Sequence, residues 1–359
     1  MIGRSQIWKA CGTALIAAGL IAIPEIDRPA HGIAATAIED FPKESGLSVM
    51  TYNIEGLPWP VRSGRGAALA AIGTRLRELR DSGRQPHVVL LQEAFSEDAQ
   101  RIGIDAGYPH IVRGPDAAMA GRTAVSHDDL DFEGAGRFLK GERSGKLVGS
   151  GLEILSDYPI LEVRREAFPA YACAGYDCLA NKGIVMAVVT VPGQPTPVAI
   201  VDVHLNSRHA AHVPRARSLY AYRAQIDALD DFLRRNAPAG MPMIVGGDFN
   251  IGQDGSRRAY VDARLGHWWG GAKRDAFHMC MAVADGCGMT MSTDALKSLR
   301  HGRDWQFLAP AGGTELSVRR IAVPFGREAD GTMLSDHIGY AAYYSLGMPN
   351  PPLRLALAR

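Results

Sequence analysis

Apolar and polar residues alternate along much of the chain, and continuous apolar runs lie between the alternating stretches. Residues 47–57 alternate as in a half-buried strand, and the run at 87–95 predicts a fully buried one. Between them, residues 67–83 carry apolar side chains at near-helical spacing, which predicts a helix that Gly83 ends. Further strands are predicted at 150–156, 183–191, 197–206, 241–250, 305–310, 317–323 and 338–346.

Two longer connections interrupt the strands. Residues 214–236 have a proline near their first turn and place large apolar side chains along one face, which predicts an amphipathic helix. Residues 115–147 mix both charges with glycines and keep no period, which predicts an inserted surface loop. The apolar face of the helix comprises Leu219, Tyr222, Ile226, Leu229 and Leu233.

The order of elements favours two packed sheets. Many strands with few helices between them do not fit a doubly wound parallel sheet. Helices with one apolar stripe need an apolar sheet face to cover, so we expect helices on the outside of the two sheets. At 359 residues, of which 47% are hydrophobic, the chain can form one catalytic domain with a large core.

The N-terminus has the pattern of a secretory signal. Arg4 and Lys9 precede the apolar run 10–23, and small residues follow it. The run is short for a membrane span, although an uncleaved anchor is the alternative. We therefore expect a signal peptide at 1–37, a linker at 38–45, a catalytic domain at 46–346 and a tail at 347–359. The expected location is periplasmic or extracellular, with membrane association as a further option.

The charge balance argues against a non-specific DNA-binding protein. The chain has 39 basic and 38 acidic residues. Removal of the signal takes away Arg4, Lys9 and Arg28 together with Glu25 and Asp27, which leaves a neutral protein. Non-specific DNA binding normally uses a basic excess, so nucleic acid is the less favoured partner.

The cysteines outside the signal form two local pairs, Cys173 with Cys178 and Cys280 with Cys287. In an exported protein these pairs predict two short disulfide loops. Free thiols are the alternative. A zinc site is disfavoured because the spacings do not match a Cys-x-x-Cys knuckle.

Polar residues recur where the apolar strands end. Any one of them could cap a turn or a helix, which is the commoner role of such a residue. Together they include the groups that hydrolysis of a phosphate ester requires: hard oxygen ligands for a metal, amides for phosphate oxygens, an imidazole that activates water, and a carboxylate that orients it. They are Asn53, Glu93, Asp202, His204, Asn206, Asp248, Asn250, Asp304, Asp336 and His337.

These residues lie in short motifs that resemble the endonuclease/exonuclease/phosphatase superfamily of metal-dependent phosphoesterases. The resemblance implies an α/β (α+β) fold, a four-layer α/β/β/α sandwich of the deoxyribonuclease I type. Eight motifs occur in the superfamily's order. They lie at 51–60, 88–95, 150–160, 181–189, 201–207, 244–250, 304–308 and 334–337.

The resemblance implies a metal site with Mg²⁺, or Mn²⁺, as the cofactor. Glu93 resembles the principal metal ligand, Asn53 lies beside it, and Asp336 supports the metal or the surrounding network. Glu55 matches an acidic metal-site residue in some branches only. Asp202 departs from the pattern and is interpreted as a strand-end cap.

The resemblance also implies the catalytic roles. His337 resembles the general base that takes a proton from the attacking water, and Asp304 the carboxylate that holds its ring. His204 and Asn250 resemble groups that bind phosphate and stabilise charge. Asp248 resembles the group that assists the water or the leaving group.

Residues 171–185 resemble the equivalent piece of secreted and neutral sphingomyelinases. Asp177 and Lys182 match an Asp/Lys pair of that branch, and Lys182 could meet a lipid phosphate as a point charge. The alternative is a surface lysine after a turn. Asn206 is the third predicted substrate-binding residue. Tryptophans at 57–60 and 266–271 would suit a membrane interface if they lie on loops, whereas packing on the domain is the commoner outcome.

Other classes have weaker signals. Residues 207–223 are rich in arginine and could bind a nucleic-acid backbone, but a solvated helix face is the simpler interpretation. The chain has no His-Glu-x-x-His, Gly-x-Ser-x-Gly or Walker motif, which argues against a zinc protease, a serine hydrolase and an NTPase.

The leading hypothesis is an exported Mg²⁺-dependent phosphodiesterase that releases the headgroup of a phospholipid at a membrane surface, with no obligate protein partner. A secreted nuclease resembling deoxyribonuclease I is the second. A catalytically silent lipid-binding module is the third.

Overall fold

The computed structural model describes residues 46–347 except 59, 60, 124, 125, 272, 283–286, 288–291 and 312, all within the compact unit Gly32–Arg359. The predicted signal and linker, Trp59 and the tail from residue 348 onward lie outside the described residues. No helix of the described part is both long and apolar enough to cross a membrane.

Two sheets form the centre of the domain. The six-stranded sheet has the order β10-β11-β1-β2-β4-β3, and the five-stranded sheet has the order β5-β6-β7-β8-β9. Their strands are β1 (Leu47–Asn53), β2 (Val88–Gln92), β3 (His110–Arg113), β4 (Glu153–Ser156), β5 (Ile160–Ala167), β6 (Gly183–Val189), β7 (Val198–His204), β8 (Met243–Asp248), β9 (Asp304–Ala309), β10 (Glu315–Phe325) and β11 (Gly339–Gly347).

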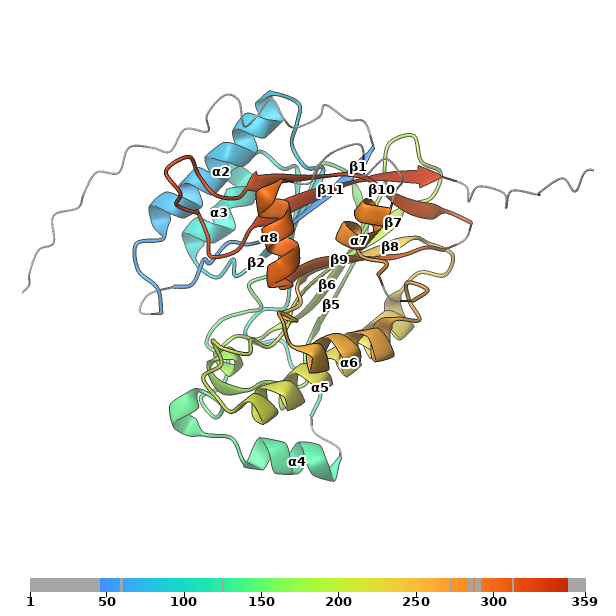
Figure 1. Cartoon of the computed structure of the whole chain (residues 1–359). Coiled ribbons are helices and arrows are strands. Elements are labelled where there is room, and N and C mark those ends of the chain that lie inside the picture. The colour runs from blue at the N-terminus through green and yellow to red at the C-terminus, as the bar shows by residue number, and fades with distance from the viewer. Residues whose placement is uncertain are drawn as a thin grey trace, which may run out of the picture. The chain divides into compact units, whose positions relative to one another are not determined.

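Helices cover the outer face of each sheet, α2 and α3 on one and α5 and α6 on the other (Figure 1). The apolar stripe of α2 packs with α3 on the six-stranded sheet, and α5 packs with α6 on the five-stranded sheet. The helices are α2 (Gly66–Asp81), α3 (Glu97–Asp105), α4 (His127–Gly134), α5 (Arg215–Asn236), α6 (Gly255–Leu265), α7 (Ala276–Ala282) and α8 (Thr293–His301), with 3₁₀ turns η1 (Phe138–Lys140) and η2 (Gly175–Leu179).

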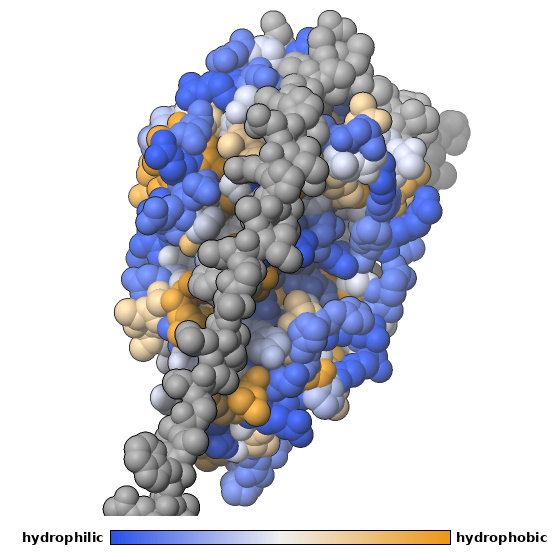
Figure 2. All heavy atoms as spheres, turned by 90° about the vertical axis from the view of Figure 1, so that its left-hand side faces the viewer, coloured by the Kyte–Doolittle hydropathy of each residue, from blue (hydrophilic) through white to orange (hydrophobic). Residues whose placement is uncertain are grey.

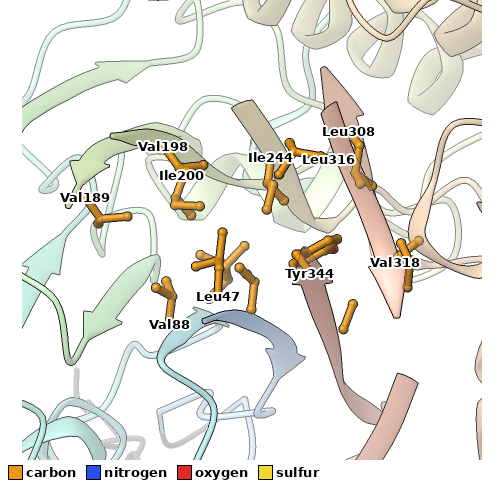
Figure 3. Packing of buried hydrophobic residues seen from close by; sticks show 14 of the residues in the cluster. Leu47, Val88, Val189, Val198, Ile200, Ile244, Leu308, Leu316, Val318 and Tyr344 are labelled. Atoms are coloured by element: carbon orange, nitrogen blue, oxygen red, sulfur yellow. The ribbon is translucent and has the colours of Figure 1, made fainter. Parts of the chain in front are cut away.

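The largest core cluster fills the space between the two sheets (Figure 3). Leu47 and Val88 of one sheet face Ile200 and Ile244 of the other, and all four are buried. Branched side chains on both inner faces give each sheet an apolar partner. The fold is therefore the expected α/β/β/α sandwich.

Several elements escaped the sequence analysis. The segment predicted as an irregular loop at 115–147 contains α4, which starts where Ser126 accepts a hydrogen bond from the Asp129 amide. Helix α4 has no buried residue, so it lacks the apolar stripe that would have revealed it. The edge strand β5 is only partly buried and half of its residues are charged, so its apolar pattern is weak and it was also missed. The short elements α3, β3, α6, α7 and α8 were also missed.

Candidate active site

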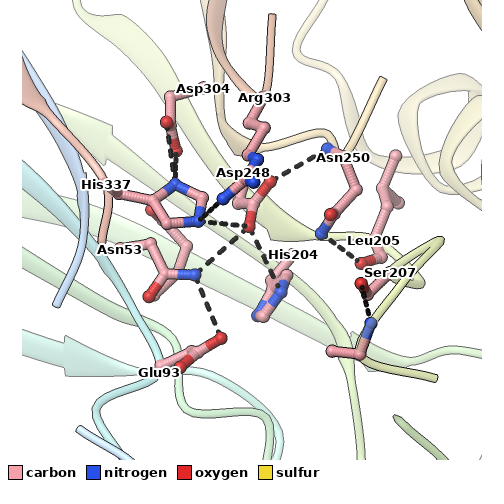
Figure 4. Close-up of polar contacts among 12 residues, drawn as sticks. Asn53, Glu93, His204, Leu205, Ser207, Asp248, Asn250, Arg303, Asp304 and His337 are labelled. Atoms are coloured by element: carbon pink, nitrogen blue, oxygen red, sulfur yellow. Dashed lines mark hydrogen bonds and ion pairs between the residues drawn. The ribbon is translucent and has the colours of Figure 1, made fainter. Parts of the chain in front are cut away.

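The functional side chains gather where strands of both sheets end at the same edge (Figure 4). Asn53 is the last residue of β1, and His204 and Asp248 end the parallel neighbours β7 and β8. Strand β9 runs antiparallel to β8, so its first residue, Asp304, pairs with Asp248. His337 precedes β11, which is antiparallel to β1. The sheet topology thus brings together residues that are far apart in the sequence.

Asn53 connects the two sheets at the centre of the site. Its Nδ2 donates to Glu93 Oε1 at 3.1 Å and to Asp248 Oδ2 at 3.2 Å, although Asp248 is 195 residues away. The Asn53 carbonyl oxygen Oδ1 accepts from the Glu55 amide. One amide therefore fixes a carboxylate from each sheet.

His337 and Asp304 form a hydrogen-bonded dyad. His337 Nδ1 lies 2.9 Å from Asp304 Oδ2, and both side chains are buried. The other ring nitrogen, Nε2, lies 3.8 Å from Asp248 Oδ2. Burial lowers the pKa of His337, but the nearby charges of Asp304 and Asp248 outweigh it and raise the pKa to about 10.

Arg303 was not predicted as a site residue. Its Nη1 lies 3.3 Å from His337 Nε2 and can donate to that nitrogen only when the ring is neutral, so Arg303 opposes the carboxylates that favour the charged ring. The sequence signal was a basic residue immediately before the strand-start Asp304, but such neighbours are common on protein surfaces.

His204 lies beside a buried lysine. Lys182 Nζ is 3.1 Å from His204 Nε2, 3.2 Å from the Leu205 carbonyl and 2.9 Å from Asp177 Oδ1. Burial, and then the Lys182 charge, hold the pKa of His204 well below its usual range. His204 Nδ1 is buried with no hydrogen-bond partner. Lys182 is only 6% exposed, so the alternative of a surface lysine is wrong.

Glu93 follows β2 in a left-handed backbone conformation, with φ at 60°. Glu55 and Asn250, which flank the same strand ends, have φ of 52° and 48°. Non-glycine residues rarely adopt these angles, and such strain concentrates at functional sites. Here the left-handed conformation occurs at three polar residues, Glu55, Glu93 and Asn250, which follow the ends of buried strands.

The donor set of the site fits a hard divalent cation. The carboxylates of Glu93 and Asp248 both accept a hydrogen bond from the side-chain amide of Asn53. Burial raises the pKa of Glu93 to about 7 and that of Asp248 to about 6. Carboxylate and amide oxygens are the ligands that Mg²⁺ prefers, and a cation would relieve the repulsion of the crowded charges. Asp248, Asp304 and His337 also offer ligand atoms within 4.8 Å of one another. A cation bound by Asp248, Asp304 and His337 would compete with the Asp304–His337 hydrogen bond. A cation bound at Glu93, beside Asn53, would leave that hydrogen bond intact.

Other predicted residues lie at the margin of this group. Asn250 donates through its backbone amide to Asp248 Oδ1 and through Nδ2 to the Leu205 carbonyl. Asn206 is fully buried and accepts from the Ala174 amide, so it anchors the loop that contains Asp177. The structure does not bring its side chain to the dyad.

Asp336 and Glu55 also lie apart from the metal-binding candidates. The side chain of Asp336 is 58% exposed and pairs with Arg303 at 3.6 Å. Glu55 pairs with Arg62 and Arg65. The contribution of Asp336 to a metal site stays a prediction.

One interpretation from the sequence is corrected. Asp202 is not a strand-end cap: it lies within β7, fully buried, where its Oδ1 accepts from Gln92 Nε2 of the other sheet at 2.7 Å.

For the tryptophans of 266–271, the structure confirms the outcome that was considered the commoner one, packing on the domain. Trp269 is buried, and Trp268 Nε1 donates to Asp230 at 2.8 Å, so both pack on the domain.

Both predicted disulfides are present, between Cys173 and Cys178 and between Cys280 and Cys287. The first closes a short loop around Asp177. The Asp177 carboxylate accepts a hydrogen bond from the Ser207 amide and also forms an ion pair with Lys182. This disulfide thus borders the group around His204.

A model of the endonuclease/exonuclease/phosphatase family matches residues 50–338. The chain belongs to this family. The match spans all the strand-end residues described above, and the predicted relationship is confirmed. No curated protein sequence matches the chain at a significant level.

Solved structures of family-like fold resemble the chain at low sequence identity. Sphingomyelinase C from Streptomyces griseocarneus is 20% identical with a TM-score of 0.52, covering 84% of this chain and 99% of that one. Beta toxin from Staphylococcus aureus with bound magnesium ions is 16% identical with a TM-score of 0.54, covering 83% and 99%. TDP2 from D. rerio, complexed with a single-strand DNA product, is 17% identical with a TM-score of 0.50, covering 84% and 100%. These likenesses show a shared fold.

Proposed function

We propose that this family member is an exported, Mg²⁺-dependent phosphodiesterase that releases the headgroup of a phospholipid. The observation that carries the proposal is the Asp304–His337 dyad opposite the carboxylates held by Asn53, with the buried Lys182–His204 pair beside them. This arrangement combines a proton acceptor, an anionic metal-binding edge and a cation for phosphate. Manganese, as another hard divalent cation, is the alternative metal.

The chain's own groups divide the work of hydrolysis. Asp304 accepts a hydrogen bond from Nδ1–H of His337, which leaves the ring nitrogen Nε2 free to act as a base. Nε2 takes a proton from water while the water oxygen bonds to phosphorus. Lys182 and Arg303 supply positive charge for the phosphate oxygens. The bond from phosphorus to the lipid alcohol then breaks, and Asp248 is placed to assist the proton transfer to the departing oxygen.

Glu93, with Asn53 beside it, would hold Mg²⁺, and the bound ion would supply positive charge for a phosphate oxygen and counter the carboxylate charges that raise the pKa of His337. The left-handed turn at Glu93 and the Asn53 hydrogen bond keep this carboxylate at the edge shared by the two sheets.

The similarity to a sphingomyelinase C favours a lipid substrate over DNA. The arginine-rich helix gives little support to a nuclease. Arg215 pairs with Asp254 at 2.7 Å, and Arg217 pairs with the buried Glu142 at 2.5 Å. Both guanidinium groups are already engaged, although the fold shared with TDP2 keeps a nuclease as the second candidate.

A substrate panel tests the proposal. Purified protein with Mg²⁺ should release phosphocholine from sphingomyelin or a headgroup from another phospholipid, and EDTA should abolish release. His337→Ala is the matched inactive variant. The nuclease would replace the lipid assignment if two results were obtained together. The protein would release no headgroup from any phospholipid, and it would nick plasmid DNA whereas the His204→Ala variant would not.

A further inference from the structure

An exposed apolar surface lies next to the group around Lys182. Phe138 is 67% exposed, Leu139 86% and Leu147 66%, and Tyr176 in η2 is 43% exposed. Water-exposed aromatic and aliphatic side chains gathered on one surface mark an interaction site more often than isolated ones do. We name residues 137–147 the Phe138 loop.

The parts of this surface contact one another. Lys140 Nζ lies 5.5 Å from the centre of the Tyr176 ring, and the Leu147 amide donates to the Leu179 carbonyl at 2.7 Å. The Phe138 loop and η2 therefore form one surface, although about 30 residues separate them in the sequence. Figure 2, which faces the left-hand side of Figure 1, shows apolar side chains among hydrophilic ones in the lower half of the view.

The surface is held in place by partly buried contacts. Glu142 Oε1 accepts from the Gly175 amide at 2.9 Å and from Arg217 Nε at 2.5 Å. The rings of Phe132 and Tyr220 stack at 4.3 Å. These contacts fix the base of the loop to α5 and η2 while its apolar tip stays exposed.

The charge of the Phe138 loop identifies the kind of partner. It carries Arg137, Lys140 and Arg143, and its one acidic residue, Glu142, pairs with Arg217. Lys146 Nζ points inward, 3.7 Å from Cys173 Sγ, and does not contribute to the exposed charge. Basic side chains around protruding aromatic and aliphatic ones suit an anionic lipid surface, where the cations meet headgroups and the apolar tips enter the acyl boundary. The exposed carboxylates Asp128, Asp131 and Glu133 belong to the preceding helix α4 and not to this loop.

We infer that the Phe138 loop and Tyr176 form the docking surface for a phospholipid membrane that contains anionic lipids. The inference rests on the proposed function and deepens it. Tyr176 directly precedes Asp177, whose carboxylate pairs with Lys182 at 2.9 Å, and Lys182 contacts His204 at 3.1 Å. Docking at this surface brings lipid phosphates to the side of the site that carries these groups.

Sedimentation with vesicles tests the inference independently of catalysis. The full chain with Phe138→Ser and Leu139→Ser should bind vesicles of phosphatidylcholine and phosphatidylserine about tenfold to a hundredfold more weakly than the parent. Arg137→Gln should reduce binding about fivefold, but only when phosphatidylserine is present. Leu161→Ser is the matched control, because Leu161 is 61% exposed on the edge strand β5 and should leave binding unchanged.

Activity on a soluble phosphodiester separates this inference from the proposed function. Phe138→Ser with Leu139→Ser should keep the parent rate on bis-p-nitrophenyl phosphate while losing hydrolysis of vesicle lipid. If the parent releases no headgroup but the double variant still binds vesicles more weakly than the parent, the docking surface is retained and the proposed function is removed. The inference would be overturned if the double variant bound vesicles as tightly as the parent. It would also be overturned if the parent were a dimer, and the double variant lost the dimer but kept vesicle binding.

Discussion

Lys182 Nζ lies 3.1 Å from His204 Nε2, and both side chains are buried against the strand ends of the five-stranded sheet. An ammonium and an imidazole share this space because His204 is neutral: burial and the lysine charge depress its pKa well below the usual range. Neutral Nε2 accepts a hydrogen bond from Lys182, and Asp177 balances the lysine charge. Lys182 is thus fixed as a positive charge inside the site.

Replacing Lys182 by methionine should reduce kcat/KM for a phosphodiester about a hundredfold, because a fixed charge aimed at the phosphate is lost. The pKa of His204 should rise in the same variant, which NMR titration of the imidazole would detect. Lys297→Met, on helix α8, is the control and should match the parent. An unchanged rate in Lys182→Met would exclude the lysine from catalysis.

The raised pKa of His337 predicts how stability depends on pH. In metal-free protein, a folded pKa of about 10 against an ordinary 6.5 gives a stabilising contribution that is complete below about pH 6.5 and lost as the pH rises through about 10. The free energy of unfolding should therefore fall over this range, by at most about 1.4 kcal/mol per pH unit for one group. Urea unfolding in EDTA measures the slope.

Asp304→Asn should flatten that slope, because it removes the main charge that favours the imidazolium. Asp336→Asn should largely keep it, because the Asp336 side chain is 58% exposed. A parent slope that persists in Asp304→Asn would assign the titration to other groups.

Protons should compete with Mg²⁺ at Glu93. Because burial raises the pKa of Glu93 to about 7, the Mg²⁺ dissociation constant should rise about tenfold for each pH unit below about 7. Glu93→Gln should bind Mg²⁺ weakly at every pH in isothermal titration calorimetry. Glu153 on β4 is the matched control: burial also raises its pKa to about 7, but it pairs with Arg113 of β3. Equal loss of Mg²⁺ binding in Glu153→Gln would contradict the assignment.

The two disulfides should differ in their effect on activity. Cys173→Ser with Cys178→Ser should lower kcat/KM about tenfold, because this bond closes the loop that positions Asp177 against Lys182. Cys280→Ser with Cys287→Ser should lower the melting temperature and leave kcat/KM near the parent value, since that bond lies in the core between the sheets. Equal kinetics in both double variants would remove the positioning role of the first.

The sequence alone determined most of the buried strands, the two longest helices and the chemical types at the strand ends. Period-2 and period-3.6 patterns are local, so 198–204 and 215–236 could be recognised without knowing their neighbours. Glu93, Asp248, Asp304 and His337 were recognised because each is polar at one end of an apolar run and lies in a motif that resembles the family. Helix α4, which has no buried residue, and strand β5, which has one, were missed because burial on one face supplies the pattern.

The tertiary structure alone decided which polar groups share a site and what each contacts. Asn206 lies in the same motif as His204, and Asp336 in the same motif as His337, yet Asn206 is buried as a loop anchor and Asp336 is exposed beside Arg303. Asp202 faces Gln92 across the sheets. These outcomes depend on side-chain direction and on distances between strands far apart in the chain, which are set when the two sheets pack and not by any local period.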